Sequence, residues 1–437
     1  MNTRIHRKHL AVATGLAAVA AIATTAVSAA SGPQPLAADP GPFDGTNPAN
    51  ASIPTYDYDD PSRSFVVQAH FGMHGATVND VSVGMGRSRS HLGDPSLLEL
   101  RLRSATDAPL GSIDAWDPRW VFEETAGGGE RMEIRPGPGM LITPFDADAE
   151  SMVVYDVEAG EALTTVDLAP AIREYCLDHP EDAQCVSADL AVTASEATGT
   201  GFSVVGETTQ VEVATTVENL GPDGPVDGVV DEVVTAPAGV TVTPTGSTWD
   251  ADGLAVGAPR EHASSYDVTC EEPGVHTVTV ESTIEPALAK VADPDASNNA
   301  GTAELEIECA IPVKLDIKPG SDRNPVNVNE ATIPMAVLTT EAGEFGLPLA
   351  FDATTVKVAG LRIGDRDALV TSASGVPERH GKVHLEDVTP KDGDVDAMLH
   401  AAGREIPVTA STTELCVRGT TTSGLSFFGC DVVDVVP

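Results

Sequence analysis

Four aspartates near the C-terminus could bind a metal ion. Asp387, Asp392, Asp394 and Asp396 lie in one short stretch around Gly393. A calcium ion takes roughly six to eight hard oxygen ligands, and carboxylates packed around a glycine turn can supply several of them. The sequence therefore predicts a calcium site formed by these four side chains.

The spacing of this stretch also allows a second interpretation. Counting every second residue from Asp392 gives the D-x-D-x-D spacing of a calcium loop, but Ala397 then occupies the position where such a loop needs glycine. Lys391 brings a positive charge into the same loop. The alternative is an acidic hairpin loop, on an acidic protein, that binds no ion.

The six cysteines fall into three close pairs. There is no C-x-x-C motif, and no histidine lies at metal-ligand spacing from a cysteine pair, so zinc is a weak explanation for them. Disulfides form in the oxidising environment that an exported protein meets. We predict the three sequential pairs, because each then lies within one expected domain: Cys176–Cys185, Cys270–Cys309 and Cys416–Cys430.

No residue pattern predicts a catalytic centre. Of the histidines His70, His74 and His91, the first two have a spacing that suits zinc on a helix. The glycine-containing segment 71–75 instead predicts a strand end or a turn, so the two side chains need not converge. The G-x-S-x-G motif of a nucleophilic serine is absent, and the even cysteine count leaves no free thiol. The sequence therefore predicts a protein that is not an enzyme.

The charge balance excludes one large class of partner. The chain has 66 acidic and 25 basic residues, which gives a formal net charge of −41. This charge repels phosphate backbones and anionic lipid surfaces at long range, so we expect no nucleic-acid partner. The hydrophobic content of 41% is sufficient for a packed core.

The N-terminal segment resembles an export signal. Residues 1–30 combine a basic start, an apolar run from 10 to 27 and small residues at the end, which is the pattern of a secretory signal peptide. An uncleaved membrane anchor is the alternative. Residues 31–55 are rich in Pro, Gly, Asn and Asp and are expected to be a disordered leader. We predict a secreted, extracellular protein with no stable membrane insertion after cleavage.

Residues 56–186 have the pattern of a first β-domain of unknown role. Leu98, Leu100 and Leu102 alternate with charged residues, and this period of two is typical of a half-buried strand. The Gly-Pro cluster at 136–139 is expected to separate strands. A short helix is predicted over 169–175. The strand candidates are residues 64–70, 77–83, 97–103 and 152–157.

Four aromatic residues are concentrated in this first domain: Trp116, Trp120, Phe122 and Tyr155. Exposed aromatics on a sheet face could bind glycans, whereas buried ones would belong to the core. Large aromatic side chains are usually mostly buried. The sequence therefore favours a core position for them.

Residues 187–310 contain several short strands at even spacing, which indicates an immunoglobulin-like sandwich. They read "ADLAVTAS…TTVENLGPDGP…TAPAGVTVTPTG…DPDASNNAGTAELEIEC", with a turn expected at 219–222. This stretch resembles the Ig-like repeats of bacterial surface proteins, including the cell-adhesion-related domain. The resemblance implies an extracellular spacer or adhesion module without catalysis.

Residues 311–437 resemble another exported module. The segment "VKLDIKPGSDRNPVNVNEATIPMAVLTT" is similar to the I-D-I-K-P-G-S…I-P-V-A-I-L motif of an uncharacterised secreted bacterial module. Members of that module commonly carry D-V-N-G-D-G-x-x-D where this chain has its acidic stretch, and this likeness implies calcium. No reaction is attached to the module.

These observations predict an all-β protein of three consecutive β-sandwich (Ig-like) domains after a signal peptide and leader. The favoured function is that of an exported, non-catalytic modular protein in adhesion, extracellular matrix or as a spacer, with a cell-surface protein or glycan as partner. The alternative is an extracellular hydrolase or polysaccharide-binding accessory with its site in residues 56–186. A cleft with convergent polar groups would favour that alternative.

Overall fold

The computed structural model describes residues 62–86, 98–124, 130–327, 329–388 and 391–436. The predicted signal peptide, the leader and His91 lie outside the described residues. Within them the chain is mostly β-strand, with two short α-helices, α2 (Ala169–Asp178) and α3 (Arg366–Ser372). The predicted all-β sandwich fold class is therefore confirmed. The predicted domain boundaries stay a prediction.

The described residues between 62 and 185 form two main antiparallel sheets, with strand orders β2-β1-β7 and β4-β3-β8-β9. Phe65 and Val67 of the first sheet share one apolar core with Leu100 and Val154 of the second. The strands are β1 (Arg63–Phe71), β2 (Ala76–Met85), β3 (Leu98–Arg103), β4 (Pro109–Ala115), β5 (Trp120–Glu124), β6 (Glu130–Ile134), β7 (Gly137–Pro144), β8 (Ser151–Asp156) and β9 (Glu161–Asp167).

Helix α2 follows β9 and extends three residues beyond the predicted segment. Proline stands in its first turn, where a missing backbone N–H costs nothing. Ile172, Tyr175 and Cys176 bury one face of the helix against the core. Cys176, near the last turn, is bonded to Cys185, which ties the helix end to the chain that follows.

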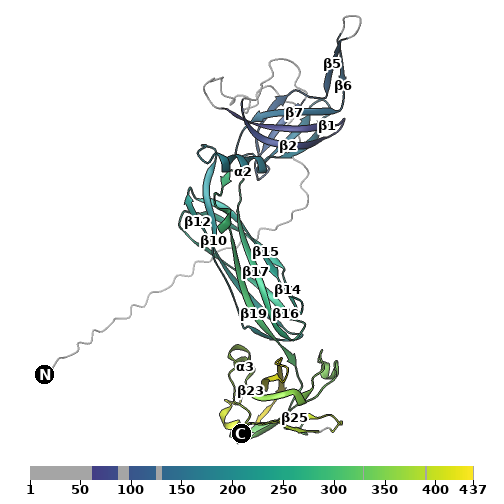
Figure 1. Cartoon of the computed structure of the whole chain (residues 1–437), viewed down its shortest axis with the longest axis vertical. Coiled ribbons are helices and arrows are strands. Elements are labelled where there is room, and N and C mark those ends of the chain that lie inside the picture. Colours follow the sequence, from purple (N-terminus) through teal and green to yellow (C-terminus); the bar gives the residue numbers. More distant parts are fainter. Residues whose placement is uncertain (1–61, 87–97, 125–129, 328, 389–390, 437) are drawn as a thin grey trace, which may run out of the picture. The chain divides into compact units, whose positions relative to one another are not determined.

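Residues 186–312 form two packed sheets (Figure 1). One has the order β14-β16-β12-β10-β18, and the other contains β15-β13-β17-β19. Val211 and Val213 meet Val278 and Val280 in a shared core. The strands are β10 (Val186–Gly199), β11 (Phe202–Val204), β12 (Thr208–Pro222), β13 (Val226–Thr235), β14 (Val240–Thr243), β15 (Gly246–Leu254), β16 (Arg260–Cys270), β17 (Gly274–Pro286), β18 (Val291–Ala292) and β19 (Ala300–Pro312).

The C-terminal residues contribute two further groups of strands. Strand β19 pairs with β27, so β27-β26-β23 continue the sheet of β17 and β19, while a separate sheet has the order β20-β22-β25-β24. Apolar side chains of both groups share one core. The strands are β20 (Leu315–Ile317), β21 (Pro325–Asn327), β22 (Ile333–Val337), β23 (Val356–Gly364), β24 (His384–Glu386), β25 (Asp396–Ala401), β26 (Glu414–Thr421), β27 (Ser426–Val432) and β28 (Asp434–Val436).

The disulfide prediction is confirmed for all six cysteines. The bonds are Cys176–Cys185, Cys270–Cys309 and Cys416–Cys430. Cys416 and Cys430 stand directly opposite each other in the register of β26 and β27, so the third bond staples a hairpin as expected. Among the described residues, no helix has the length and apolar character needed to cross a membrane.

The predicted break at 136–139 is displaced toward its first residue. Strand β6 ends at Ile134 and β7 begins at Gly137 and pairs with β1, so Pro136 lies between the strands and the other three residues lie in β7. A Cβ on Gly139 would lie 2.4 Å from a Pro118 side-chain carbon, so glycine serves close packing here and not a turn.

The expected turn at 219–222 is wrong, since β12 continues to Pro222. Asn219 is fully buried there, and its amide donates hydrogen bonds to the carbonyls of Asp223 and Leu254. The Asn side chain therefore anchors neighbouring loops to the strand end.

Candidate functional site

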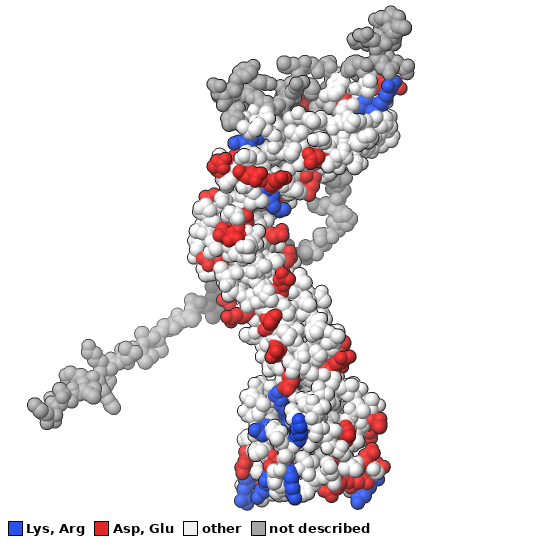
Figure 2. Space-filling model, viewed as in Figure 1, with Lys and Arg blue, Asp and Glu red and all other residues white. Residues whose placement is uncertain are grey.

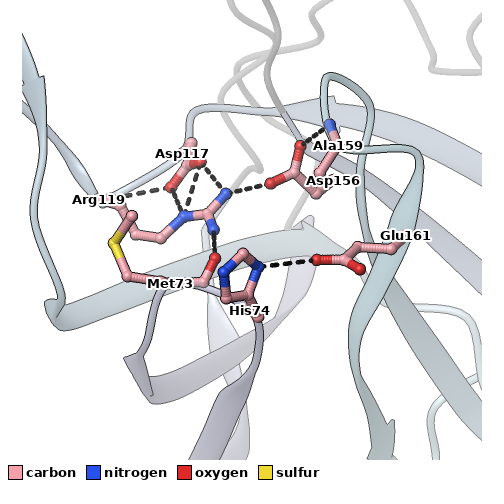
Figure 3. Close-up of polar contacts among 7 residues, drawn as sticks. All are labelled: Met73, His74, Asp117, Arg119, Asp156, Ala159 and Glu161. Carbon is pink, nitrogen blue, oxygen red and sulfur yellow. Dashed lines mark hydrogen bonds and ion pairs between the residues drawn. The ribbon is translucent and has the colours of Figure 1, made fainter.

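A buried charge cluster in the N-terminal part joins Arg119 to Asp117 and Asp156 (Figure 3). Asp117 and Arg119 lie in the turn between β4 and β5, and Asp156 ends β8. All three are less than a tenth exposed. This is the part of the molecule in which the hydrolase hypothesis requires a site.

Each nitrogen of the Arg119 guanidinium donates to an acceptor. Its Nε donates to both carboxylate oxygens of Asp117, at 3.0 and 2.9 Å, and its Nη2 donates to Asp156. Its Nη1 donates to the carbonyl of Met73 at 2.9 Å, and Asp156 also accepts the backbone N–H of Ala159 at 2.8 Å. The cluster thus connects the 117–119 turn to the end of β1 and to β8.

The electrostatics of this cluster follow from the pairing. The hydrogen bond to Asp117 raises the pKa of Arg119, against the lowering effect of burial. Burial alone would raise the pKa of Asp156, but the N–H of Ala159 and the guanidinium of Arg119 outweigh it and lower that pKa. Both shifts favour the charged forms, so neither Arg119 nor Asp156 is poised to exchange a proton near neutral pH.

The histidines singled out in the sequence lie on the surface beside this cluster. The predicted turn at 71–75 is present, with the N–H of Gly72 bonded to the carbonyl of Gly75 at 2.7 Å. His74 is largely exposed, and its Nδ1 lies 3.3 Å from a carboxylate oxygen of Glu161. His70, at the end of β1, is exposed as well. The metal-compatible groups found among the described residues do not include these two histidines.

The aromatic side chains differ from their expected core position. Trp116, Trp120 and Tyr155 are only partly buried, and the side chain of Phe122 is outside the described residues. The tryptophans flank the turn that presents Asp117 and Arg119, and Tyr155 lies on the outer face of β8 with the guanidinium of Arg101 3.7 Å from its ring centre. These three rings are therefore partly buried and lie outside the core, and a cation–π contact covers that of Tyr155.

A shallow hollow of about 270 Å³ is lined by residues of the N-terminal part together with Leu288 and Lys290, which come just before β18. Its polar side chains are already paired. Lys290 forms an ion pair with Asp148, and Glu150 accepts the backbone N–H of Ala289. The hollow does not bring together a set of unpaired polar groups.

The acidic loop of the calcium prediction lies between β24 and β25. Asp396 begins β25 and is buried, and its carboxylate accepts the backbone N–H groups of Thr339 at 2.9 Å and Val388 at 3.2 Å. Burial, with the charges of Asp392 and Asp387 nearby, raises its pKa. Through these hydrogen bonds Asp396 fixes the ends of the loop, whether or not the loop binds an ion.

The other three aspartates make fewer hydrogen bonds within the fold than Asp396 does. Asp392 accepts only the N–H of Asp394 among the hydrogen bonds of the described residues, and both are exposed. One carboxylate oxygen of Asp387, Oδ1, is shielded from solvent and has no hydrogen-bond partner in the described part of the chain. The four aspartates are not among the described groups whose ligand atoms converge within 4.8 Å, so calcium would have to draw the loop together.

A different cluster, which the sequence analysis missed, does converge. The ligating atoms of His380, His384 and His400 lie within 4.8 Å of one another. The H-x-x-x-H spacing of 380 and 384 was the available signal, but nothing in the sequence showed that His400 joins them. A second converging group contains Glu414 with Cys416 and Cys430, whose sulfurs are already joined in a disulfide.

The middle sandwich buries a carboxylate between its sheets. Glu232 accepts hydrogen bonds from Thr215 at 2.8 Å, Ser247 at 2.8 Å and Tyr266 at 2.7 Å. Burial alone would raise its pKa, but the hydroxyl donors of Ser264, Tyr266 and their neighbours outweigh burial and lower it. Glu232 is a fully satisfied internal anion.

Charge on the surface is distributed unevenly. On the face shown in Figure 2, acidic side chains are spread over all parts of the described chain, whereas the largest group of Lys and Arg lies in the C-terminal part. Most of that face is therefore expected to repel polyanions.

Comparison with known proteins gives only structural similarities. No known family model matches the chain, and no curated protein matches it. A CARDB domain of the PF1109 protein from Pyrococcus furiosus, determined in complex with di-metal ions, is 18% identical with a TM-score of 0.19. The match covers 28% of this chain and 89% of that one.

Two other solved structures are similar at comparable levels. The PapD-like domain 7 of human CEP192 is 13% identical, with a TM-score of 0.16 over 27% of this chain and 84% of that one. Red sea bream transglutaminase is 12% identical, with a TM-score of 0.18 over 73% of this chain and 41% of that one. At these values the similarities assign no function.

Proposed function

We propose that this chain is an exported, non-catalytic modular protein that acts in adhesion, in an extracellular matrix or as a spacer, with a cell-surface protein or glycan as its partner. The observation that carries the proposal is the pairing of its buried charges. In the N-terminal part, Arg119 and Asp156 have shifted pKa values because they are bonded to each other and to further groups of the fold. The pKa of Asp182 is lowered by the N–H of Gln184 and the hydroxyl of Tyr175, which outweigh burial. Catalytic groups with shifted pKa values instead face a cleft where substrate can reach them.

The cysteine chemistry supports an extracellular location. All six cysteines are in disulfides, and such bonds persist in oxidising compartments and are rare in reducing ones. The basic and apolar pattern of residues 1–30 agrees with this as an export signal. Secretion is thus the simplest source of both features.

The strand pairing supports a spacer role. Strand β19 belongs to the middle sandwich and, at its end, pairs in parallel with β27 through Ile311 and Pro312. Phe202 and Ala310 pack with Phe428 in the same apolar cluster, and the guanidinium of Arg418 lies 3.7 Å from the Phe202 ring centre. A shared sheet edge and an apolar contact resist the hinge motion that is the default between domains.

Calcium at the acidic loop is part of the proposal. Oδ1 of Asp387, which has no hydrogen-bond partner among the described residues, could be a calcium ligand if the loop closed around an ion. The exposed carboxylates of Asp392 and Asp394 could contribute further ligands. The ion would then stiffen the connection between β24 and β25.

Binding and turnover assays on the full chain, recovered from an exporting bacterial host, test the proposal. The protein is applied to immobilised bacterial polysaccharides and to a glycan array, and in parallel it is incubated with a panel of glycosidase, peptidase and esterase substrates. We expect saturable binding to at least one surface and no turnover above that of a reduced, heat-denatured sample. The native protein should also contain no free thiols.

Turnover that follows the protein through purification and is lost in Asp156→Asn would overturn the non-catalytic part of the proposal. Retention of the protein in the cytoplasm with reduced cysteines would overturn the extracellular part. These two outcomes are independent, so each part of the proposal can fail by itself.

A further inference from the structure

Three imidazoles converge on one face of the C-terminal part. The ring centres of His380 and His400 are 4.6 Å apart, those of His384 and His400 are 5.7 Å apart, and those of His380 and His384 are 6.1 Å apart. One ligating nitrogen from each ring falls within 4.8 Å of the other two. A tetrahedral zinc site needs such nitrogens at about 2.0–2.1 Å from the ion, which moderate ring rotation would achieve.

The backbone holds two of these rings on the same sheet face. His400 lies on β25, which is bordered by β22 on one side and β24 on the other. Ala397, Leu399 and Ala401 point into the core, so His400 points outward. His384 lies on β24 opposite Met398, which places it diagonally next to His400, within reach of a long side chain.

The third ring is brought in by the segment that precedes β24. Glu378 forms a bridge with Ala401, and the N–H of Arg379 donates to the carbonyl of His400 at 2.8 Å. His380 follows directly, so its Cα is tied to the same strand. The three histidines are thus fixed by hydrogen-bonded backbone and not by a long free loop.

A buried carboxylate lies against two of the imidazoles. The side chain of Glu378 is fully buried, and one of its oxygens is 3.8 Å from Nδ1 of His400 and 3.9 Å from Nδ1 of His380. Its hydrogen bonds come from the backbone N–H groups of Lys382 and His400. Within the described residues, its ion-pair partners are these two histidines, so a bound cation would compensate a buried negative charge.

His400 also carries an unsatisfied polar atom. Its Nδ1 is shielded from solvent and has no hydrogen-bond partner among the described residues. Buried polar atoms of native proteins are nearly always paired, and such an atom is suited to bind an ion or a water molecule.

We propose that His380, His384 and His400 form a binding site for a divalent transition metal, with zinc as the first candidate. Imidazole nitrogen suits zinc, copper and nickel, whereas calcium and magnesium prefer oxygen. Glu378 is a positioning residue, since a carboxylate beside a ligating histidine fixes the ring orientation and increases its basicity. Three protein ligands leave one position for water or for a donor atom from a partner.

The metal would pin the segment from Glu378 to Glu386 onto β25. Because it binds the folded protein in preference to the unfolded chain, it would raise the melting temperature of the C-terminal part. This inference does not depend on the proposed adhesion or spacer role, and it uses nitrogen ligands distinct from the oxygens of the acidic loop.

Calorimetry on the full chain with zinc chloride, after removal of metals by a chelator, tests the site. We expect one high-affinity zinc per chain, and with cobalt(II) the visible absorption of a tetrahedral complex. His380 is half exposed and His384 lies on an edge strand, so each can be replaced without disturbing the core. The variants His380→Gln and His384→Gln should each abolish high-affinity zinc binding. His276→Gln, at a partly buried histidine of the middle sandwich that lies outside the cluster, is the matched control and should bind like the wild type.

Glu378→Gln should keep the stoichiometry and weaken zinc affinity by about 10- to 100-fold, as loss of a carboxylate beside a ligating histidine does elsewhere. The proposal is overturned if the wild type binds zinc no better than the His380→Gln variant, or if His276→Gln removes the same event. Circular dichroism of each variant confirms that the sheets are intact, so that loss of zinc binding is not loss of fold.

Discussion

Tyr266 donates a hydrogen bond to Glu232 at 2.7 Å between the two sheets of the middle sandwich, where both side chains are almost inaccessible to solvent. Neither partner could be buried alone at low cost, because an unpaired carboxylate or phenol loses its hydration without replacement. Burial and the carboxylate raise the pKa of Tyr266 to about 12. The pair therefore stays in one protonation state across the physiological range.

Removing the phenol should destabilise this sandwich. We expect Tyr266→Phe to lower the free energy of unfolding by about 1–3 kcal/mol, since Glu232 then keeps a charge with one donor fewer. Thr248→Val is the control, because Thr248 donates to Asp231 in an exposed pair of the same sheet, and it should change stability by less than about 0.5 kcal/mol. Urea unfolding monitored by circular dichroism compares them, and equal effects would contradict a special role for the buried pair.

The same carboxylate predicts an acid-sensitive sandwich. The folded state lowers the pKa of Glu232 below its ordinary value of 4.5, so folding is favoured by its ionised form. This contribution is present in full above that ordinary value and is lost as the pH falls through the lower folded-state pKa. Stability measured from neutral pH down to about pH 3 should therefore fall more steeply in the wild type than in Glu232→Gln. Parallel pH profiles for the two proteins would refute the assignment.

The buried ion pairs of the N-terminal part predict an asymmetric mutational effect. Arg119→Met leaves Asp117 and Asp156 buried without their cation, which should cost about 3–5 kcal/mol. Arg103→Met removes the more exposed pair with Asp107 and should cost less than about 1 kcal/mol. Thermal melting of both variants gives the comparison, and a small loss for Arg119→Met would mean that water replaces the guanidinium.

The disulfides should contribute according to the length of chain that they close. Cys270 and Cys309 are separated by 39 residues and Cys176 and Cys185 by 9, so the first bond restricts the unfolded chain more. Replacing both cysteines by alanine should cost about 1 kcal/mol more at the first pair than at the second. Denaturant unfolding of the two double variants measures this, and a reversed order would show that packing around the sulfurs dominates.

Local sequence patterns predicted the strands but not their partners. The alternation of Leu98, Leu100 and Leu102 depends only on neighbouring residues, and it correctly placed β3. Gly139 and Asn219 suggested turns because their types are common there, yet contacts with distant residues such as Pro118 and Leu254 keep them in strands.

Prediction of the candidate sites from the sequence was limited for the same reason, because contacts between residues distant in sequence decide them. The acidic loop is contiguous in sequence and was therefore found, although Asp396 turned out to hold backbone N–H groups. The histidine cluster depends on the pairing of β24 with β25 and on a bridge from Glu378 to Ala401. Such long-range register cannot be obtained from spacing alone.

The acidic loop itself predicts a calcium response that can be separated from any effect of zinc. If the loop closes around calcium, the C-terminal part should melt at a higher temperature with calcium than with a calcium-selective chelator. The stabilisation would be about 2.7 kcal/mol at an ion concentration 100 times the dissociation constant.

Asp392→Asn should abolish this shift with little effect on the calcium-free protein, because its carboxylate is exposed. Asp367→Asn, an exposed residue of α3, should leave the shift unchanged. If calcium does not change the melting temperature of the wild type, the loop is an acidic hairpin whose order comes from the backbone bonds of Asp396 alone.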